Sequence, residues 1–200
     1  MNNLSSHHPS PKSETQSLSI DGYQIDVLFS ESILKERIEE LAKEIAASKP
    51  ERLLVIPVLK GSFIFSADLI RAMHRAGLSP EVDFMILASY REGTRSSGKV
   101  DVLRDIETNV DGRDVLLVDD ILESGRTLAF AKDLISARGA RSAKSCVLLE
   151  KPGHLAANIA SDYRGFVCPD LFVVGYGMDM AHQFRELPFV GHVIKGPNVG

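Results

Sequence analysis

The chain has 200 residues, of which 44% are hydrophobic and 25% are charged, and its formal net charge is −4. This composition is typical of a globular domain with an apolar core, and the acidic balance argues against a dedicated nucleic-acid binder. No apolar run approaches the roughly 20 residues of a membrane-spanning helix, so we expect no membrane partner.

The N-terminal residues 1–17 are polar and rich in Ser, without the apolar segment of a signal peptide. This composition predicts a disordered tail. The two cysteines, Cys146 and Cys168, lie far apart in apolar runs and form no CxxC motif. We interpret them as reduced core thiols, as is typical of a cytoplasmic protein.

Strands and helices alternate after the tail. Residues 18–29 predict a strand or a hairpin that turns at Gly22, and Ser30 is a suitable N-cap for a helix over 31–48. The apolar runs that predict buried strands are 52–62, 81–90, 115–118 and 145–150. A helix after the first run is expected to bury Phe63, Ala67, Ile70 and Met73 and to end at Gly77. A third helix follows residue 127 and ends near Arg138. This alternation predicts an α/β fold with a parallel-sheet core flanked by helices.

Polar residues follow each of these strands, where ligands bind in parallel sheets. They are Lys60, Gly61 and Ser62 after the first strand, Ser89 and Tyr90 after the second, Asp119 and Asp120 after the third, and Glu150 and Lys151 after the fourth. Four strand ends of this kind predict one site for a polyanionic ligand.

The stretch VLLVDDILESGRTLAF (115–130) joins a strand, two acids, a glycine turn and a helix. Backbone amides at such a helix start bind phosphate, and the hydroxyls of Ser124 and Thr127 can assist. Neither GxxxxGK[ST] nor GxGxxG is present there. Asp119 and Asp120 can accept hydrogen bonds from sugar hydroxyls, and Mg²⁺ can neutralise them. The pattern predicts a sugar 5-phosphate that carries a metal-bound group, although an isolated acid pair can equally be a helix cap or a solvated pair.

VLLVDDILESGRT resembles the phosphoribosyl-pyrophosphate signature of type I phosphoribosyltransferases. LKGS at 59–62 resembles their pyrophosphate loop, in which the peptide before Lys60 is typically cis. LLEKPG, FVCPDLFVVGYGMD and FREL resemble the base-binding hood of hypoxanthine-guanine phosphoribosyltransferases. The resemblance runs from about residue 18 to about 195. It implies one phosphoribosyltransferase domain over 18–200, with a core of about 50–150 and a hood from 18–28 and 151–195.

The resemblance also implies roles for individual residues. Asp119 and Asp120 would hold the ribose hydroxyls and Mg²⁺, and Asp179 would bind a second Mg²⁺. The ribose 5-phosphate loop would comprise Glu123, Ser124, Gly125, Arg126 and Thr127. Lys60, Gly61 and Arg185 would hold the pyrophosphate. Ser89 and Tyr90 would be the first residues of a mobile lid that continues over 91–104. This segment could equally be an ordinary hairpin loop.

The same resemblance implies that the base is recognised by Lys151, Phe172, Val173 and Asp179. Lys151 can only donate, so it suits the O6 acceptor of hypoxanthine or guanine and disfavours adenine. Phe172 would stack on the purine, although by pattern alone it is a core residue. Glu123 stands where the family usually has Asp, and we assign it as the acid/base group at N7. Alternatively, only its backbone N–H matters.

These roles imply a Mg²⁺-dependent purine-salvage enzyme that converts hypoxanthine or guanine and phosphoribosyl pyrophosphate to IMP or GMP and pyrophosphate. A homodimer or homotetramer in the cytoplasm, without nucleic acid, is expected. The alternatives are a transferase for another base such as xanthine, and a non-catalytic regulator that senses phosphoribosyl pyrophosphate while it binds nucleic acid.

Overall fold

The computed structural model describes residues 16–92, 95–153, 155–157 and 159–196. Two sheets organise them. The larger has the strand order β6-β5-β3-β7-β8-β9, and β4 pairs with β3 beside this path. Its strands are β3 (Leu54–Leu59), β4 (Glu81–Val82), β5 (Met85–Glu92), β6 (Arg95–Arg104), β7 (Asp114–Leu122), β8 (Ser142–Glu150) and β9 (Tyr163–Val167). All neighbours pair in parallel except β5 and β6, so the predicted parallel-sheet core is confirmed.

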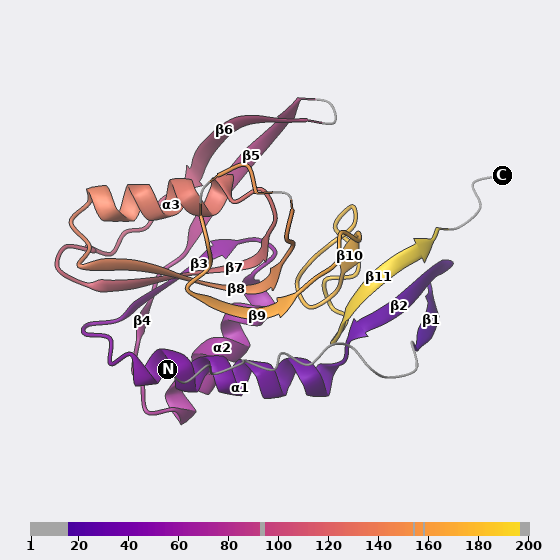
Figure 1. The fold of residues 1–200 in the computed structure, drawn as a ribbon, viewed down its shortest axis with the longest axis horizontal. Helices are drawn as coiled ribbons and strands as arrows, with labels where there is room; N and C mark the ends of the chain where they lie inside the picture. The colour runs from indigo at the N-terminus through magenta and orange to yellow at the C-terminus, as the bar shows by residue number, and fades with distance from the viewer. Residues whose placement is uncertain (1–15, 93–94, 154, 158, 197–200) are drawn as a thin grey trace, which may run out of the picture.

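Helices cover both faces of this sheet. α1 (Glu31–Ala47) and α2 (Phe63–Arg75) lie on one face, and α3 (Arg126–Ala137) lies on the other (Figure 1). Alternate strand residues point to opposite faces. Val55, Leu116, Val118, Cys146 and Leu148 pack with α1 and α2, whereas Leu54, Ile56, Val115, Leu117 and Val147 pack with α3. Burial of both faces explains why these strands are continuous apolar runs.

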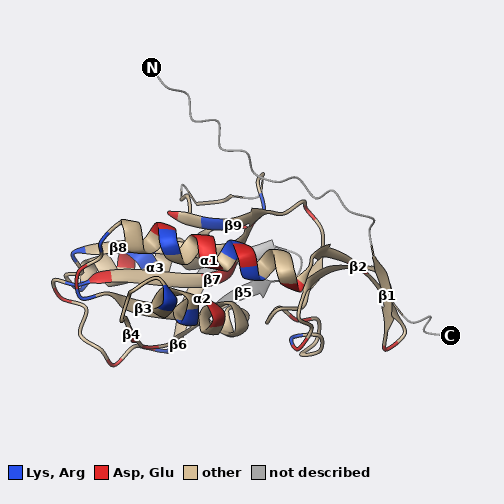
Figure 2. Ribbon diagram, turned by 90° about the horizontal axis from the view of Figure 1, so that it is seen from below, with Lys and Arg blue, Asp and Glu red and all other residues tan. Residues whose placement is uncertain are grey.

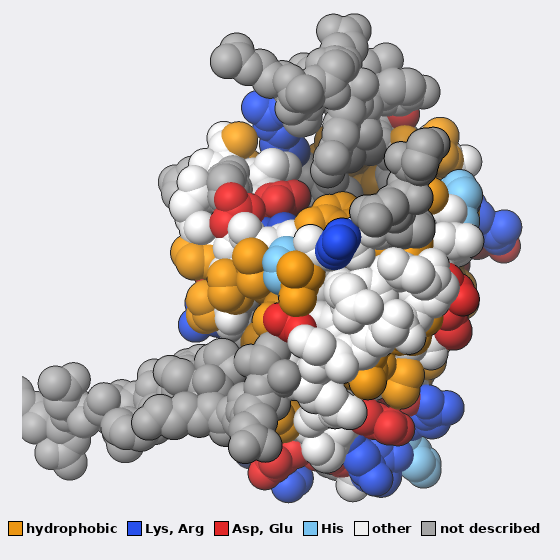
Figure 3. All heavy atoms as spheres, turned by 90° about the vertical axis from the view of Figure 1, so that its right-hand side faces the viewer, with side chains coloured by type: hydrophobic (Ala, Val, Ile, Leu, Met, Phe, Trp, Pro, Cys, Tyr) orange, Lys and Arg blue, Asp and Glu red, His pale blue; other side chains and the backbone are white. Residues whose placement is uncertain are grey.

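The second sheet is antiparallel and has the order β1-β2-β11-β10. Its strands are β1 (Ser17–Ile20), β2 (Tyr23–Phe29), β10 (Val173–Val174) and β11 (Val190–Lys195). The hairpin predicted at Gly22 is confirmed, with a positive φ of 80° at that residue. At this end of the molecule, apolar side chains form several separate surface groups among polar ones (Figure 3).

The helix starts follow the sequence. The side chain of Ser30 caps α1 by accepting a hydrogen bond from the backbone N of Ile33 at 3.5 Å, as predicted. The stripe predicted for α2 was right for Met73, which is buried, but wrong for Phe63, which is 42% exposed. The other buried residues of the helix are Phe65, Ser66, Leu69 and Ala72. Phe63 is the first residue of α2, and it lies against the backbone of Gly177 rather than under the sheet.

Three boundaries differ from the sequence expectations. The strand expected over 81–90 is broken at Asp83, whose carboxylate accepts the backbone N–H groups of Phe84, Glu107 and Thr108. The loop expected after β5 is mostly strand β6, which pairs with β5. The tail expected over 1–17 lies outside the described residues except for its last two, and Ser17 already pairs in β1.

Residues 163–167 were assigned to the hood, but they form β9 in the main sheet, beside β8. Arg37 of α1 explains this position. Its guanidinium donates to the carbonyls of Arg164 at 2.8 Å and Gly165 at 3.2 Å, which ties the edge strand to the helix. Among the described residues, no helix is long and apolar enough to cross a bilayer.

Candidate active site

The turn between β7 and α3 has the geometry of a phosphate loop. Gly125 is the N-cap of α3, and its φ of 75° falls in the left-handed region that favours glycine. Gly125 makes no side-chain cap bond, and the backbone N of Arg126, the first residue of α3, donates to Ser124 Oγ at 3.5 Å. The backbone amides at such a helix start can bind an anion. The Ser124 carbonyl accepts the N–H groups of Ala156 at 2.9 Å and Ala157 at 3.2 Å, which fixes the turn from outside.

Asp119 and Asp120 lie inside the carboxyl end of β7, which is longer than the predicted strand. Burial raises the pKa of Asp119 well above its usual range, and the neighbouring charge of Asp120 adds to this rise. Burial also raises the pKa of Asp120, while hydrogen bonds and Arg185 oppose the rise. The backbone N of Ile121 donates to Asp120 Oδ1 at 2.8 Å. A backbone N–H group therefore helps to hold the pair in place, and burial favours the protonated form of its carboxyl groups.

The Lys60–Gly61 loop touches this acid pair. The peptide bond between Leu59 and Lys60 is cis, as the resemblance implied. A Cβ atom on Gly61 would lie 1.7 Å from Asp120 Oδ2, so only glycine leaves room for the carboxylate. The end of β3 and the end of β7 thus meet in direct contact.

A cavity of 260 Å³ lies at these strand ends. It gathers eight predicted site residues, namely Lys60, Gly61, Asp119, Asp120, Glu123, Ser124, Gly125 and Thr127, with an apolar border of Val58, Leu59, Leu87, Ile121, Leu122 and Leu128. Donors for phosphate and acceptors for sugar hydroxyls therefore share one space.

Arg185 and Asp179 form a second part of the site. Arg185 Nη2 lies 2.7 Å from Asp179 Oδ1, and Arg185 Nη1 donates to the Gly177 carbonyl at 2.6 Å. A Cβ atom on Gly177 would lie 2.2 Å from the Gly61 carbonyl oxygen, so this segment touches the Lys60–Gly61 loop. Sequence reasoning missed Gly177, although a glycine two residues before Asp179 was a signal for such an approach.

Of the residues expected to read the base, Lys151 reaches the cavity through its contact with Glu123. Lys151 is buried, and its Nζ donates to Glu123 Oε1 at 3.2 Å. Phe172 is 54% exposed, so the core alternative for it is wrong. Val173 is buried in β10. The pairing of β5 with β6 includes Ser89, but the side chains of Ser89 and Tyr90 lie outside the described residues, as do residues 93 and 94, so the lid stays a prediction.

The part of the chain that the structure describes contains no preformed cluster of three or more His, Cys, Asp or Glu side chains for a metal ion. Asp119 and Asp120 supply two carboxylates, and Asp179 is engaged by Arg185. Mg²⁺ takes only one or two protein carboxylates and completes its octahedron with water and phosphate oxygens. The acid pair therefore fits a metal that arrives with its ligand.

Comparison with known proteins supplies the deciding observation. The phosphoribosyl transferase domain model matches residues 25–181. The chain belongs to the phosphoribosyltransferase family. The hypoxanthine-guanine phosphoribosyltransferase of Bacillus subtilis is 42% identical over 166 residues, which cover 82% of this chain and 91% of that protein.

Solved structures of the family agree with this assignment. A hypoxanthine-guanine phosphoribosyltransferase from Bacillus anthracis matches with a TM-score of 0.79 and 42% identity, over 84% of this chain and 98% of that one. The predicted type I phosphoribosyltransferase fold is thereby confirmed. The bifunctional protein TilS/HprT of Listeria innocua is 47% identical over 82% of this chain but over 25% of its own length. The chain thus spans about a quarter of the length of that relative.

Proposed function

We propose that this phosphoribosyltransferase acts in purine salvage and converts hypoxanthine or guanine, with phosphoribosyl pyrophosphate, to IMP or GMP and pyrophosphate. The observation that carries the proposal is the shared cavity at the ends of β3 and β7, which holds the phosphate loop, the acid pair and the Lys60–Gly61 loop. The Lys151–Glu123 pair lies directly beside it.

In this proposal, the reaction breaks the bond between C1′ and the pyrophosphate oxygen and forms a bond from C1′ to N9 of the base. Residues 123–127 bind the 5-phosphate through the helix start, and Asp119 and Asp120 accept hydrogen bonds from the ribose hydroxyls. Lys60, Gly61 and Arg185 hold the leaving pyrophosphate, since a guanidinium fork suits phosphate oxygens. A bound Mg²⁺ ion would neutralise negative charge on the pyrophosphate and beside the acid pair.

Glu123 has the proton-transfer role. As N9 bonds to C1′, the base must lose the proton at N7, and the Glu123 carboxylate accepts it. Lys151 donates to O6 of a 6-oxopurine. Adenine presents an amino donor at the same position, so two donors would face each other, and such a mismatch in a buried site can cost about 10⁴-fold in specificity. Phe172, which is largely exposed, would cover one face of the purine.

The assembly and location are part of the proposal. We infer a homodimer or homotetramer in the cytoplasm and Mg²⁺ as the metal. The regulator that binds nucleic acid would need a basic face. On α1 and α2, however, acidic and basic residues are mixed (Figure 2), which favours the enzyme.

Nucleotide formation from phosphoribosyl pyrophosphate tests the function, with hypoxanthine, guanine, xanthine and adenine offered separately, with and without Mg²⁺. Mg²⁺-dependent product from hypoxanthine or guanine, with adenine inert, is the expected result. Preference for xanthine or adenine would contradict the substrate assignment. Binding of phosphoribosyl pyrophosphate without turnover would favour the regulator.

Two lysine variants sharpen the test of base choice. Lys151→Met is expected to raise KM for hypoxanthine by about 100-fold, because O6 loses its donor, and to reduce the preference over adenine. Lys144→Met is the matched control. Lys144 lies on β8, where its Nζ is 5.7 Å from the centre of the Tyr163 ring, and its loss should leave base preference unchanged.

A further inference from the structure

The position of Arg185 depends on the loop that contains Gly177. Arg185 Nη1 donates to the Gly177 carbonyl at 2.6 Å, and the backbone N of Gly177 donates to the Arg185 carbonyl at 3.0 Å. The same Gly177 touches the carbonyl of Gly61. A shift of the loop would therefore move the guanidinium relative to the Lys60–Gly61 loop.

The loop backbone has a conformation that side chains rarely adopt. Tyr176 has a φ of 51°, and Ala181, His182 and Phe184 also have positive φ values. Such a backbone persists only where surrounding contacts fix it, and clusters of this kind occur at ligand sites. Phe184 supplies one contact, because it is buried edge-on against Tyr23 with ring centres 5.2 Å apart.

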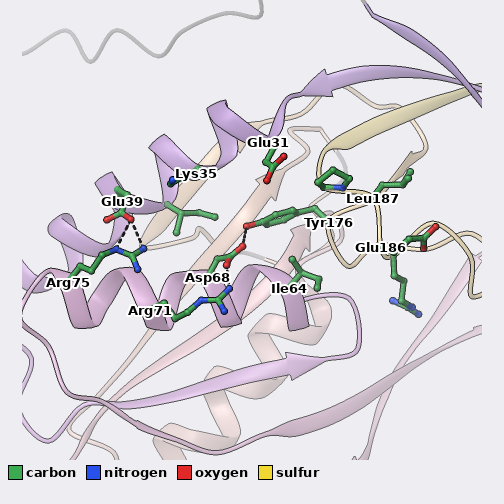
Figure 4. Close-up of a pocket in the computed structure, with 13 residues that line it drawn as sticks. Glu31, Lys35, Glu39, Ile64, Asp68, Arg71, Arg75, Tyr176, Glu186 and Leu187 are labelled. Atoms are coloured by element: carbon green, nitrogen blue, oxygen red, sulfur yellow. Dashed lines mark hydrogen bonds and ion pairs between the residues drawn. The ribbon is translucent and has the colours of Figure 1, made fainter.

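Tyr176 supplies the other contact. Its ring is buried, and its hydroxyl donates to Asp68 Oδ2 on α2, which also pairs with Arg71 (Figure 4). Helix α2 starts at Phe63, directly after the Lys60–Gly61 loop. Burial raises the pKa of Tyr176, and the hydrogen bond to Asp68 adds to the rise, so the hydroxyl stays a donor. The hydrogen bond from Tyr176 to Asp68 thus joins α2, which follows the Lys60–Gly61 loop, to the Gly177 loop that contacts Arg185.

We propose that Tyr176 and Asp68 are positioning residues, whose hydrogen bond holds Arg185 at the distance from Lys60 and Gly61 that a pyrophosphate group requires. Neither residue touches the substrate in this arrangement. The inference rests on the proposed function only in naming pyrophosphate as the group that Arg185 binds.

The hydroxyl can be removed without an obvious threat to the fold. Tyr176 and Asp68 line a cavity of 720 Å³ between α1, α2 and the loop up to Pro188, so water can reach the Asp68 carboxylate. In a Tyr176→Phe variant, the ring keeps its burial and Asp68 keeps Arg71. If the Tyr176 hydroxyl served only the stability of the fold, the Tyr176→Phe variant would therefore bind pyrophosphate almost as tightly as the wild type.

Calorimetric binding of inorganic pyrophosphate in the presence of Mg²⁺ tests the proposal on the full chain. Tyr176→Phe and Asp68→Ala are each expected to weaken binding about tenfold, and the double variant should bind no more weakly than either single variant. Asp68→Asn keeps an acceptor oxygen for the hydroxyl and should restore most of the affinity. Tyr163→Phe is the control, because Tyr163 lies on β9 near Lys144 and should bind as the wild type does.

Steady-state kinetics supply the second readout. Both single variants should raise KM for phosphoribosyl pyrophosphate while kcat and KM for the base change less than about twofold. Unchanged pyrophosphate affinity, or additive losses in the double variant, would overturn the proposal, as would a wild type that does not bind pyrophosphate. If the wild type forms no nucleotide but the binding pattern holds, the proposed function fails and the positioning role stands.

Discussion

Lys151 Nζ and Glu123 Oε1 lie 3.2 Å apart, so the two residues assigned to the base are bonded to each other before any base is present. Lys151 is buried, whereas the Glu123 side chain is 41% exposed. A buried ammonium without a partner would be costly, and the Glu123 carboxylate provides one. Entry of a 6-oxopurine would replace this contact with one from Lys151 to O6 and another from Glu123 to N7.

Substitution of Glu123 distinguishes the contribution of its side chain to catalysis from that of its backbone N–H group. Glu123→Gln keeps the size but cannot accept a proton, so kcat should fall by about 100-fold or more while KM for phosphoribosyl pyrophosphate stays within about twofold. Glu123→Asp keeps the carboxylate, and its kcat should exceed that of the Gln variant by at least about tenfold. Rapid single-turnover measurements give the chemical step directly. Wild-type kcat in Glu123→Gln would show that only the backbone N–H of residue 123 matters.

Gly61→Ala should remove activity through Asp120. The new Cβ atom would lie 1.7 Å from Asp120 Oδ2 and 2.6 Å from its Cγ, so the carboxylate must move away from the sugar site. We expect kcat/KM for phosphoribosyl pyrophosphate to fall by about 100-fold, since misplacement of about 1 Å has this effect. Gly77→Ala is the control, because Gly77 has a φ of 89° and no neighbour within 4 Å of the new Cβ atom. It should lower the melting temperature and leave kcat/KM unchanged.

Binding of phosphoribosyl pyrophosphate should release protons from the acid pair. Burial raises the pKa values of Asp119 and Asp120, so the free protein retains a proton at a pH where an ordinary Asp is ionised. Sugar hydroxyls and Mg²⁺ favour the ionised form, and affinity should therefore rise as pH rises through the raised pKa. Calorimetry in two buffers with different ionisation enthalpies measures the protons released. Asp119→Asn should release fewer, and equal release in both proteins would contradict the assignment.

The opposite end of the sheet should control stability in acid. The Arg141 guanidinium lowers the pKa of Asp114 to about 2, and the backbone N of Glu51 and the Ser142 hydroxyl also donate to this carboxylate. A depressed carboxyl pKa stabilises the fold above the unfolded value and loses this effect as pH falls from about 4 to about 2. Arg141 is 43% exposed, so solvent screening limits the contribution to about 1–2 kcal/mol.

Urea unfolding of an Asp114→Asn variant measures this contribution. The variant should lose about 1–2 kcal/mol at neutral pH and nearly match the wild type near pH ~2. An equal deficit at both pH values would mean that shape rather than charge matters. Asp133→Asn is a suitable control for charge, because Asp133 is exposed on α3.

The parts of the fold that the sequence predicts correctly share one property. β3, β7 and β8 are buried on both faces, so each contains a continuous run of apolar residues that can be recognised in the sequence alone. β9 and β10 are short. The place of β9 depends on Arg37, which lies far away in sequence, and the place of β10 depends on its pairing with β11. The buried face of α2 was mispredicted for a different reason. Phe63 and Phe65 are both apolar, and only the packing decides which of them is buried.

The site shows the same division. The phosphate loop and the acid pair are local in sequence, so the pattern of residues 115–127 sufficed to predict that they belong together. The approach of Gly177 to Gly61 and the bond from Tyr176 to Asp68 join segments more than a hundred residues apart in the chain. No local pattern encodes such contacts, and they become visible only when the loop and α2 are folded against each other.

Cys146 and Cys168 are both fully buried as free thiols in the cluster beneath α1 and α2. Burial raises the pKa of both thiols and so disfavours the reactive thiolate form in the folded molecule. A thiol reagent can therefore modify the chain only in molecules that have opened at the central strand β8 or at the segment after β9. The rate at which a thiol reagent modifies each cysteine therefore reports how often the region around that cysteine opens in an otherwise folded population.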